Sequence, residues 1–393
     1  MSNFDLIKDA DQSYVAGTYG RFPVAVEKGK NATCYDFDGK EYIDFSSGIG
    51  VNSLGFCDEG WIEAVTAQLN TLQHISNLYY TKPCTEAAKL LCEKTGMKKV
   101  FFSNSGAESN EGAIKCARKY SYEKYGQGRN KVLTLVNSFH GRTVTTLSAT
   151  GQDVFHKYFF PFTEGFEFVP ANDTEELKKS LDGTVCAIMV ELIQGEGGVM
   201  PLDTEYVKEV EGICNEYDLV FIVDEVQTGV GRTGELFAFQ HYGIKPDIVT
   251  TAKGIGGGLP LGCILFGEKT ENVFAAGDHA TTFGGNPVAT AGAAHILSRL
   301  DGDFLDEVKK KGEYIREKIL KMPHVAGIDG LGLMMGVRLD ETVKSADVVK
   351  KAIEKGCLLL TAKAKVRLLP PLTITYEEID KGLASMEAAL SEL

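Results

Sequence analysis

The sequence predicts an α/β fold with a mainly parallel sheet, followed by a smaller α+β region. Several short apolar runs lack the polar alternation of half-exposed strands, as expected for strands that are covered on both faces. Helical patterns lie between these runs, which indicates βαβ connections. After about Gly285 the pattern changes to two helices, a group of short strands and a closing helix.

In the middle of the chain, helices are expected over residues 107–120 and 204–217. Strands are expected over residues 100–102, 131–136, 185–191, 219–225, 247–252 and 263–267. Ligands of open α/β sheets bind beyond the carboxyl ends of the strands. The residues of chemical interest that fall at those ends are Ser105, Phe139, Glu191, Asp224 and Lys253.

The C-terminal region is expected to fold as a smaller unit. Its helices should span residues 289–300, 304–322 and 376–390, and its short strands 332–339, 358–361 and 365–368. The first ~40 residues carry turn signals and are expected to pack with this unit. The expected division is an N-terminal segment (1–45), a large domain (46–290) and a C-terminal small domain (291–393).

The composition narrows the functional classes. A length of 393 residues suggests two or three domains, and a net charge of −13 disfavours non-specific binding to nucleic acid or to an anionic membrane. The nine cysteines form no C-x-x-C pair, which fits reduced thiols in a cytoplasmic protein and no metal site. No signal peptide or membrane span is recognisable. Together with the net charge, this leads us to expect neither a membrane partner nor a nucleic-acid partner.

The stretch FFSNSGAESNEGAIKCAR (101–118) resembles a strand that leads into a helix. Free N–H groups at the helix start, with Ser105, Gly106 and Ala107 around them, would suit a phosphate. The alternative is a plain N-cap by Ser103 or Ser105. No Walker loop is present.

In VNSFHGRT (136–143), three functional side chains follow one strand. Phe139 could stack on a planar cofactor, and Arg142 could bind a carboxylate with two hydrogen bonds. The alternatives are core packing for Phe139 and a surface ion pair for Arg142. A lone histidine such as His140 is more often structural.

In VELIQGEGG (190–198), Glu191, Gln194 and Glu196 stand in a glycine-rich loop after a strand. Solvated turn carboxylates are the alternative. Paired carboxylates can also indicate glycoside hydrolysis or a metal site, but no histidine cluster supports a metal, and spacing alone gives no carboxylate separation.

LVFIVDEVQTGVGRTG (219–234) contains a G-x-G-x-x-G match over residues 229–234. In dinucleotide-binding folds these glycines follow the strand directly and open a helix, whereas here Asp224 to Thr228 intervene and no long helix follows. The match therefore does not favour a nicotinamide cofactor. Asp224 at the end of an apolar strand would be partly buried and would need a cationic partner.

VTTAKGIGGGLP (249–260) places Lys253 at a strand end beside several glycines. Burial would lower the pKa of such a lysine and make its amine a nucleophile toward an aldehyde, and the glycines would leave room for a planar ring. An ordinary solvated loop lysine is the alternative.

Two further stretches offer side chains for anions. HATTFGGNPVA (279–289) carries Thr281 and Thr282 before a Gly-Gly turn, and KVRLLPPLTIT (365–375) carries Arg367 before Pro370 and Pro371. The alternative for the first stretch is an ordinary loop, and the alternative for Arg367 is an arginine on an edge strand.

Together these motifs meet the needs of pyridoxal phosphate. This cofactor requires an amine for its aldehyde, a carboxylate at its pyridine nitrogen, a phosphate anchor and groups that contact its ring. The amine would come from Lys253 and the carboxylate from Asp224. The helix start at Ser105 would anchor the phosphate, and Phe139 would contact the ring. No single motif is decisive for this cofactor, but the plain alternatives do not readily explain all of the motifs together.

The chain resembles the class III (ω-amino acid) aminotransferases of the fold type I pyridoxal phosphate enzymes. The resemblance runs nearly end to end, from residues 18–30 to residues 366–375. The matching motifs are NSGAESNEGAIK, SFHGRT, QGEGG, VDEVQTGVGRTG, TTAKGIGGGLPLG and TFGGNP, in family order. This set is specific for the fold and cofactor and less specific for the substrate.

The resemblance implies a large domain with a mainly parallel sheet sandwiched by helices, and a smaller α+β domain from the N- and C-terminal segments. It also implies ping-pong transamination between N2-acetyl-L-ornithine and 2-oxoglutarate, a step of arginine biosynthesis that yields N-acetylglutamate 5-semialdehyde and glutamate. A homodimer with active sites at the subunit interface is expected.

The resemblance further implies the cofactor contacts. Lys253 would bond to the cofactor aldehyde and then move a proton between substrate and cofactor, and Asp224 would keep the pyridine nitrogen protonated. Gln227 would lie near the phenolic oxygen. Phe139 would stack on the ring. The phosphate would bind Ser105, Gly106, Ala107 and, from the neighbouring subunit, Thr282.

The same resemblance implies the substrate contacts. Arg142 would bind the α-carboxylate of N-acetylornithine, and Thr281 would touch the substrate. Arg367 would bind the α-carboxylate of glutamate or 2-oxoglutarate. Glu196 would pair with Arg367 while the ω-amino donor is bound, and would thereby hide that charge.

Two positions depart from the family pattern. The usual G-H-x-H-P-like turn is Gly55-Phe56-Cys57-Asp58-Glu59 here, which affects local packing and not the chemistry. Ornithine aminotransferases carry a tyrosine near the position of Gly48, so Gly48 favours an N-acylated substrate. Ornithine, succinylornithine, succinyldiaminopimelate and 4-aminobutyrate remain alternative donors. A racemase or aminomutase of the same fold, or a non-catalytic binding protein, is a more distant alternative.

Overall fold

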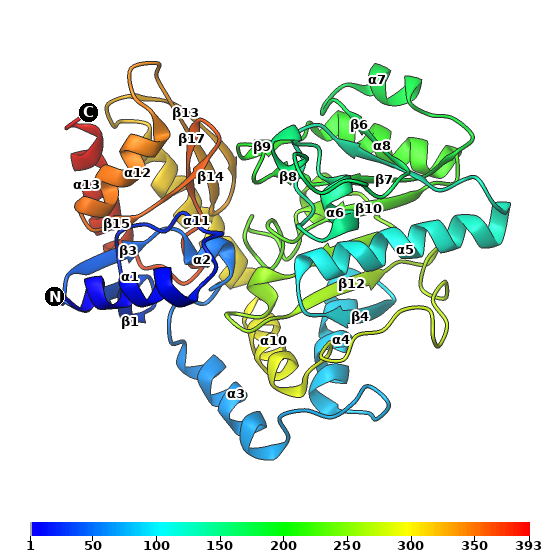
Figure 1. Ribbon diagram of the computed structural model, residues 1–393, viewed down its shortest axis with the longest axis horizontal. Coiled ribbons are helices and arrows are strands. Elements are labelled where there is room, and N and C mark those ends of the chain that lie inside the picture. Colours follow the sequence, from blue (N-terminus) through cyan, green and yellow to red (C-terminus); the bar gives the residue numbers. More distant parts are fainter. Residues whose placement is uncertain (1) are drawn as a thin grey trace.

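Residues 2–393 are described by a computed structural model, in which two lobes lie side by side (Figure 1). The larger lobe contains a seven-stranded sheet of order β4-β12-β11-β10-β7-β5-β6. Its strands are β4 (Lys99–Ser103), β5 (Lys131–Leu135), β6 (Phe166–Val169), β7 (Val185–Val190), β10 (Val220–Asp224), β11 (Ile248–Thr251) and β12 (Gly262–Phe266). Only β12 runs antiparallel to its neighbours within this sheet. The expected α/β fold with a mainly parallel sheet is therefore confirmed.

Helices cover both faces of this sheet, because successive side chains of a strand point to opposite faces. In β10, Ile222 packs in a cluster with α5 (Gly106–Tyr125), whereas Phe221 packs in a cluster with α8 (Thr204–Glu216). The remaining helices of this part of the chain are α3 (Glu59–Thr71), α4 (Lys82–Thr95), α6 (Val144–Ala149), α7 (Thr174–Lys179), α9 (Phe239–Tyr242) and α10 (Pro287–Arg299).

The smaller lobe combines both ends of the chain. It holds two four-stranded sheets, of order β1-β2-β3-β15 and β13-β14-β17-β16, and β3 pairs in parallel with β15. Its strands are β1 (Val26–Lys30), β2 (Thr33–Asp36), β3 (Glu41–Asp44), β13 (Val325–Leu331), β14 (Met334–Leu339), β15 (Cys357–Leu358), β16 (Leu360–Ala362) and β17 (Lys365–Leu368). Its helices are α11 (Gly302–Ile319), α12 (Ser345–Glu354) and α13 (Tyr376–Leu390), and the short α2 (Ser47–Gly50) lies where the two lobes meet (Figure 1).

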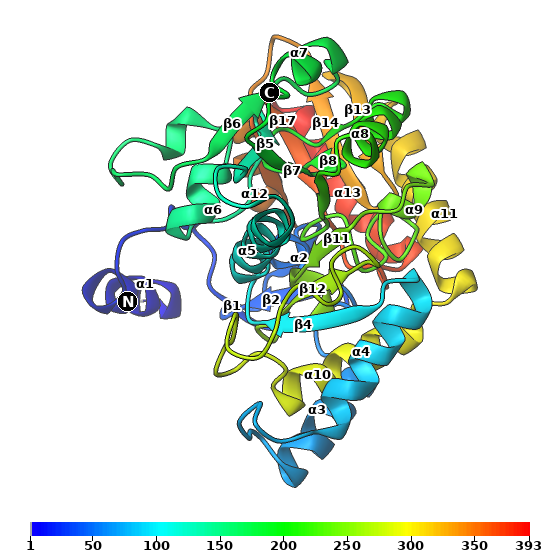
Figure 2. The same ribbon diagram turned by 90° about the vertical axis from the view of Figure 1, so that its right-hand side faces the viewer.

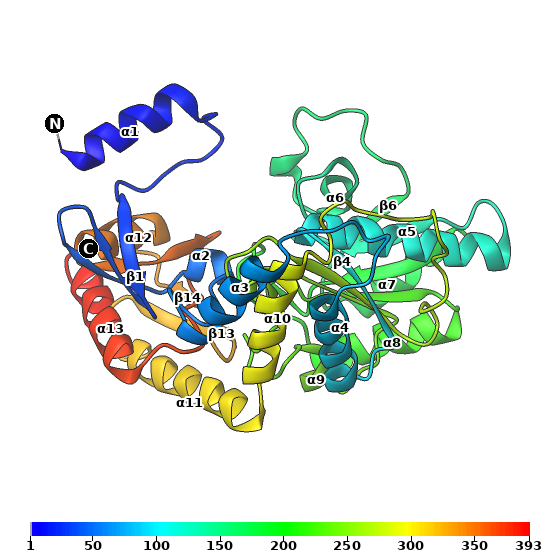
Figure 3. The same ribbon diagram turned by 90° about the horizontal axis from the view of Figure 1, so that it is seen from below.

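The N-terminal helix α1 (Asn3–Tyr14) stands apart from both lobes (Figures 2 and 3). None of its residues is buried, and Leu6, Ile7 and Tyr14 expose apolar surface. A helix of this length is marginal in water without a packed face. The helix therefore lacks, within the described chain, the contacts that normally stabilise such a segment.

The strand predictions were incomplete. The strands that were not expected are β1, β2, β3, β6, β13 and the short pair β8 (Ile193–Gln194) and β9 (Met200–Pro201). The strand expected over 358–361 is divided between β15 and β16, which belong to different sheets. β13 contains two glycines and an aspartate, so its strand propensity is weak, and pairing with β14 along its length stabilises it instead. Tertiary pairing thus overrides the local pattern.

Trp61 of α3 packs where the loop after Lys253 meets α10. A Cβ atom added to Gly257 or Gly292 would lie 2.9 Å or 2.7 Å from the indole Nε1, so both close approaches require glycine. Trp61 is the single tryptophan of the chain. Within residues 2–393, none of the helices has the length and apolar character needed to cross a membrane.

Candidate active site

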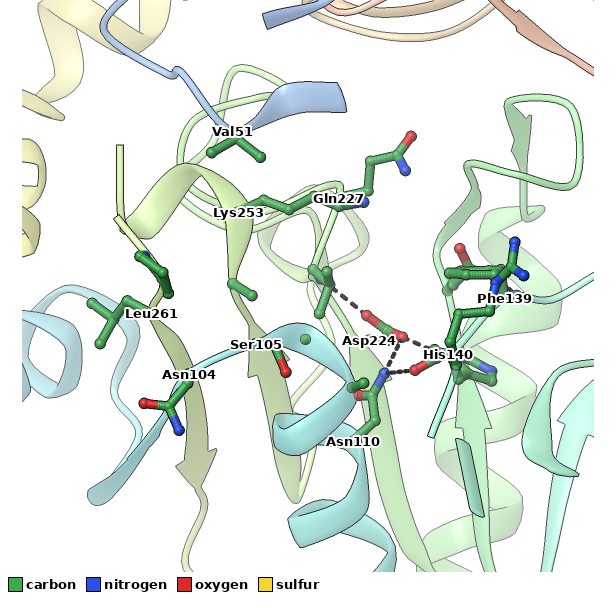
Figure 4. Close-up of a pocket in the computed structure, with 18 of the residues that line it drawn as sticks. Val51, Asn104, Ser105, Asn110, Phe139, His140, Asp224, Gln227, Lys253 and Leu261 are labelled. Carbon is green, nitrogen blue, oxygen red and sulfur yellow. Dashed lines mark hydrogen bonds and ion pairs between the residues drawn. The ribbon is translucent and has the colours of Figure 1, made fainter. Parts of the chain in front are cut away.

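A cavity of about 430 Å³ opens at the carboxyl ends of β10 and β11, beside the start of α5. Its volume suits a small organic ligand. It brings together most of the residues that the sequence predicted for the site: Ser105, Gly106, Ala107, Phe139, Arg142, Asp224, Gln227 and Lys253. These residues come from four separate segments of the chain, and Figure 4 shows how several of them line the cavity.

Lys253 follows β11 and begins the short 3₁₀ helix η2 (Lys253–Ile255). Its backbone has φ +49°, an unusual conformation for a lysine, and its side chain is half-buried in the cavity. Burial lowers the pKa of the Lys253 amine, although the negative charge of Glu196 opposes this shift. A larger share of the amine is therefore neutral and nucleophilic than in a solvated lysine.

The glycines after Lys253 allow a tight turn. A Cβ at Gly256 would lie 2.0 Å from the carbonyl oxygen of Leu259, and Gly257 and Gly258 both have positive φ. The turn keeps side chains away from the lysine, which leaves the cavity open beside it.

Asp224 is a buried carboxylate with three hydrogen-bond donors around it (Figure 4). The Asn110 side-chain amide donates to Oδ2 over 2.8 Å, His140 Nδ1 lies 2.8 Å from the same oxygen, and the Val226 backbone N–H donates to Oδ1 over 3.0 Å. Burial alone would lower the pKa of His140, but the hydrogen bond and charge of Asp224 raise it above the usual value. The two residues thus form the paired arrangement that a buried charge requires.

His140 and Asn110 were not predicted as functional residues. His140 was interpreted as structural, and Asn110 was not considered. Asn110 stands one helical turn after Gly106 on the same face of α5, and this spacing is the signal that could have indicated it. Its amide also donates to the His140 carbonyl oxygen over 2.8 Å, so it fixes both partners.

The first turn of α5 faces the cavity with small residues. Ser105 caps the helix, and its hydroxyl accepts a hydrogen bond from the Glu108 backbone N–H over 3.2 Å. A Cβ at Gly106 would lie 2.7 Å from Val226, and a Cβ at Gly141 would lie 2.8 Å from that of Ala107. Backbone N–H groups at such a helix start attract anions.

Glu196 and Arg367 form an ion pair between the two lobes. Arg367 belongs to β17, and its Nη1 and Nη2 lie 2.5 Å and 3.5 Å from the two carboxylate oxygens of Glu196. Gln227 joins the pair, because its Oε1 accepts a hydrogen bond from Arg367 over 3.3 Å. Burial alone would raise the pKa of Glu196, but the Arg367 charge holds it below the usual value. The charge of Arg367 is therefore masked in this structure.

Glu191 connects two of the loops that carry site residues. Its carboxylate accepts hydrogen bonds from the backbone N–H groups of Phe139 (2.9 Å) and Gly195 (3.3 Å). Burial raises the pKa of Glu191 to about 7. The sequence placed Glu191 at a strand end without a role, and the structure shows it holding the backbone beside the ring of Phe139.

Thr281 and Thr282 do not line the cavity of their own chain. The Thr281 hydroxyl accepts a hydrogen bond from the Asn104 amide over 2.9 Å, and Thr282 is exposed. A role for Thr282 in a neighbouring subunit stays a prediction. The glycines 229–234 form turns and do not begin a helix, as the sequence predicted.

A family model described as aminotransferase class III matches residues 14–390. An acetylornithine aminotransferase from Haemophilus ducreyi is 52% identical over 390 residues, which cover 99% of each chain. One from Caldanaerobacter subterraneus subsp. tengcongensis is 49% identical over 389 residues, which cover 98% of each chain.

The fold is similar to that of an ornithine aminotransferase from Toxoplasma gondii. The two structures superpose with a TM-score of 0.94 at 33% identity, covering 99% of this chain and 94% of that chain. The Toxoplasma structure shows partial occupancy of pyridoxal phosphate at its active site.

Proposed function

The chain belongs to the class III aminotransferases, which use pyridoxal phosphate, and we propose that it transfers the δ-amino group of N2-acetyl-L-ornithine to 2-oxoglutarate. The products are N-acetylglutamate 5-semialdehyde and glutamate. Similarity over nearly the whole length to relatives named acetylornithine aminotransferase supports this substrate. We infer a place in arginine biosynthesis from the same names.

The residues present fit pyridoxal phosphate. The cavity holds a half-buried amine with a lowered pKa, a buried carboxylate with supporting donors, and a helix start whose Gly106 leaves no room for a side chain. These are the groups that its aldehyde, ring nitrogen and phosphate require. We propose that the cofactor is held by Ser105, Gly106, Ala107, Phe139, Gln227, Asp224 and Lys253.

When bound, pyridoxal phosphate supplies a ring that withdraws electrons from the carbon that loses its proton. Lys253 would serve as the base and acid that takes and returns this proton, and its lowered pKa would suit that exchange near neutral pH. Asp224, fixed by Asn110 and His140, would hold the ring nitrogen. Phe139 would contact the ring.

The Glu196–Arg367 pair is the observation that carries the proposed substrate pair. One site must accept a donor whose amine has no adjacent carboxylate and, in the other half-reaction, an α-amino acid. The pair masks the Arg367 charge for the first substrate, and opening of the pair exposes the charge for the α-carboxylate of the second. Arg142 remains free for the carboxylate of N-acetylornithine.

A single-turnover spectral titration tests the proposed function. Holoenzyme is mixed separately with N-acetylornithine, ornithine, 4-aminobutyrate and glutamate, and loss of the visible band of the lysine-bound cofactor is followed. Fast conversion by N-acetylornithine and glutamate, with slow conversion by the other two, is expected. Conversion by glutamate without conversion by N-acetylornithine would move the donor to another ω-amine. Lys253→Ala is the control, and it should give no borohydride-trapped adduct.

We propose a homodimer whose active sites lie at the subunit interface, with Thr281 and Thr282 serving the partner's site. An exposed apolar patch supports this, because the segment between α3 and α4 meets the 279–286 loop there. The patch consists of Leu69, Ile75, Leu78, Tyr79, Tyr80 and Phe283. Patches of this kind mark interfaces, and the exposed helix α1 offers a second one.

We propose a division into an N-terminal segment (1–45), a large domain (46–290) and a small domain (291–393). The pairing of β3 with β15 and the apolar core shared by Phe45 and Met386 support the association of the two ends. We also propose a cytoplasmic location, which the nine free cysteines of the described chain support.

A further inference from the structure

Arg142 is held by aromatic rings and not by polar partners. Its guanidinium is exposed, and its carbon lies 4.3 Å from the ring centroid of Phe155 and 5.5 Å from that of Phe139. None of the hydrogen bonds or ion pairs formed among residues 2–393 involves its side chain. An arginine at the rim of a site thus keeps all its N–H donors available.

Stacking and hydrogen bonding use different parts of a guanidinium. The face lies against an aromatic ring, whereas the five N–H groups point outward in the plane of the guanidinium. A ring that restrains the plane therefore also aims the pair of N–H groups that binds a carboxylate. Phe155 is the closer of the two rings and so restrains the guanidinium more than Phe139 does.

Phe155 is itself fixed to the strand end that carries the site. It closes the 3₁₀ helix η1 (Asp153–Phe155), and the segment before it bonds to residues 137 and 138. Asn137 N–H donates to the Gly151 carbonyl (2.7 Å), Gly151 N–H donates to the Ser138 hydroxyl (3.0 Å), and the Gln152 amide donates to the Ser138 carbonyl (3.0 Å).

Phe155 also packs edge-on against Phe139, with centroids 5.7 Å apart and an interplanar angle of 73°. The ring that stacks on Arg142 is therefore anchored to the residue that we propose to stack on the cofactor. Since Phe155 is not among the residues that line the cavity, it acts through Arg142.

We propose that Phe155 is a positioning residue that sets donor selectivity, because it holds Arg142 in the orientation that receives the far-end carboxylate of the donor. This inference rests on the proposed function and specifies its substrate class: ω-amines whose other end carries a carboxylate. A residue that only packs the loop would affect donors with and without that carboxylate equally.

The test compares two donors that differ in that group alone. N-acetyl-1,4-diaminobutane has the amine, chain and acetyl group of N-acetylornithine and lacks its carboxylate. For Phe155→Leu we expect kcat/KM with N-acetylornithine to fall about 10-fold, mainly through KM. With N-acetyl-1,4-diaminobutane it should stay within about 2-fold of wild type, because no carboxylate is present to be aimed at.

Three variants complete the experiment. Phe155→Tyr keeps the ring and should restore the wild-type ratio of the two donors. Phe159→Leu removes an exposed aromatic side chain of the same loop and should leave the ratio unchanged. In an Arg142→Gln background, Phe155→Leu should add no further loss with N-acetylornithine.

The outcomes separate the two proposals. Equal losses with both donors, an unchanged ratio in Phe155→Leu, or a further loss in the Arg142→Gln background would overturn the role of Phe155. If the wild-type holoenzyme does not convert N-acetylornithine at all, the proposed function fails before any variant is measured, and this inference fails with it.

Discussion

At Asp224, one buried carboxylate receives donors from a helix, a strand end and its own loop. Asn110 comes from α5, His140 follows β5 and the Val226 N–H belongs to the turn after β10. A buried charge with fewer donors would be costly, and it would tend to be neutralised by protonation. The network therefore provides both oxygens of this buried carboxylate with hydrogen-bond donors.

Glu196→Ala should separate the two half-reactions. Without its partner, the Arg367 charge is permanently exposed in the site, so the rate of the glutamate half-reaction should rise relative to that of N-acetylornithine. We expect the ratio of the two kcat/KM values to change by about 10-fold or more. Stopped-flow measurement of each half-reaction checks this. An unchanged ratio would show that the pair has no gating role.

Glu225 predicts a pH dependence of stability. This side chain is buried, and burial raises its pKa from 4.5 to about 7. The folded protein therefore binds this proton more tightly than the unfolded chain. The stabilising contribution is complete below the unfolded pKa near 4.5 and is lost as the pH rises through about 7.

Glu225→Gln should remove this dependence. In urea unfolding, the variant should be more stable than wild type at about pH 8, by roughly 2 kcal/mol, and the difference should shrink toward about pH 5.5. Glu216→Gln, at an exposed position of α8, should leave the profile unchanged. The same pH profile in the Glu225→Gln variant and in wild type would contradict the assignment.

At the scale of elements, the start of α13 links the two ends of the chain. Thr375 and Glu378 form a capping box, and the Glu378 carboxylate also accepts hydrogen bonds from Asn31, Ala32 and Thr33. The Glu378 side chain thus accepts hydrogen bonds both from the cap of α13 and from the turn between β1 and β2. The small lobe depends on this junction, because its N- and C-terminal parts are far apart in sequence.

Glu378→Ala should lower the free energy of unfolding by about 2 kcal/mol, because several donors lose their acceptor together. The residue lies outside the cavity, so the kinetic constants of the surviving enzyme should change little. Glu387→Ala, an exposed substitution on the same helix, should change stability by less than about 0.5 kcal/mol. Equal effects of the two substitutions would contradict the role of the junction.

Helices and strands were predicted most accurately where neighbouring residues in the sequence determine their ends. β17 and α13 were predicted with their observed ends, because Pro370 and Pro371 follow the strand and Thr375 caps the helix. Six of the seven strands of the large sheet were predicted within one residue of their observed ends from their continuous apolar character, and β6 was missed. β13 was missed because its glycines weaken the pattern.

Prediction of the site residues was likewise most accurate where the signal is local. Residues at strand ends, such as Lys253 and Asp224, could be identified from the sequence because the fold class places those ends together. The contacts of Asn110 and His140 with Asp224 could not, because the first depends on the packing of α5 against the sheet and the second on the path of the chain after β5. The stacking of Arg142 on Phe155 likewise depends on a loop path that no local pattern specifies.

On the scale of the whole molecule, the site is assembled between the lobes. Arg367 comes from β17 of the smaller lobe, and Glu196 and Lys253 come from the larger lobe. A second connection is the buried Arg232, whose guanidinium donates to the backbone carbonyls of Leu333 and Pro370. Relative motion of the lobes would alter the Glu196–Arg367 distance, so the placement of the lobes and the masking of charge are coupled.

The exposed apolar patch predicts the assembly. Leu78→Asp should shift the protein from a mass of two chains toward the 42.7 kDa of one chain in light scattering, because a charge would be buried at the interface. Cofactor affinity should fall with it, since Thr282 would no longer reach the partner's site. As a control, the Leu393→Asp variant, which adds a charge at the exposed C-terminus, should remain a dimer. A Leu78→Asp variant that stays dimeric would place the interface elsewhere.

The position of Trp61 gives the enzyme an internal optical probe. Its indole contacts Gly257, which follows Lys253 by four residues, so the two side chains lie within about 20 Å of each other. If pyridoxal phosphate binds at Lys253, as we propose, it would absorb in the range in which tryptophan emits, and resonance energy transfer is efficient over such distances. Because the chain has no other tryptophan, quenching of its emission would report occupancy of the site directly. Loading and release of the cofactor can therefore be followed without any label.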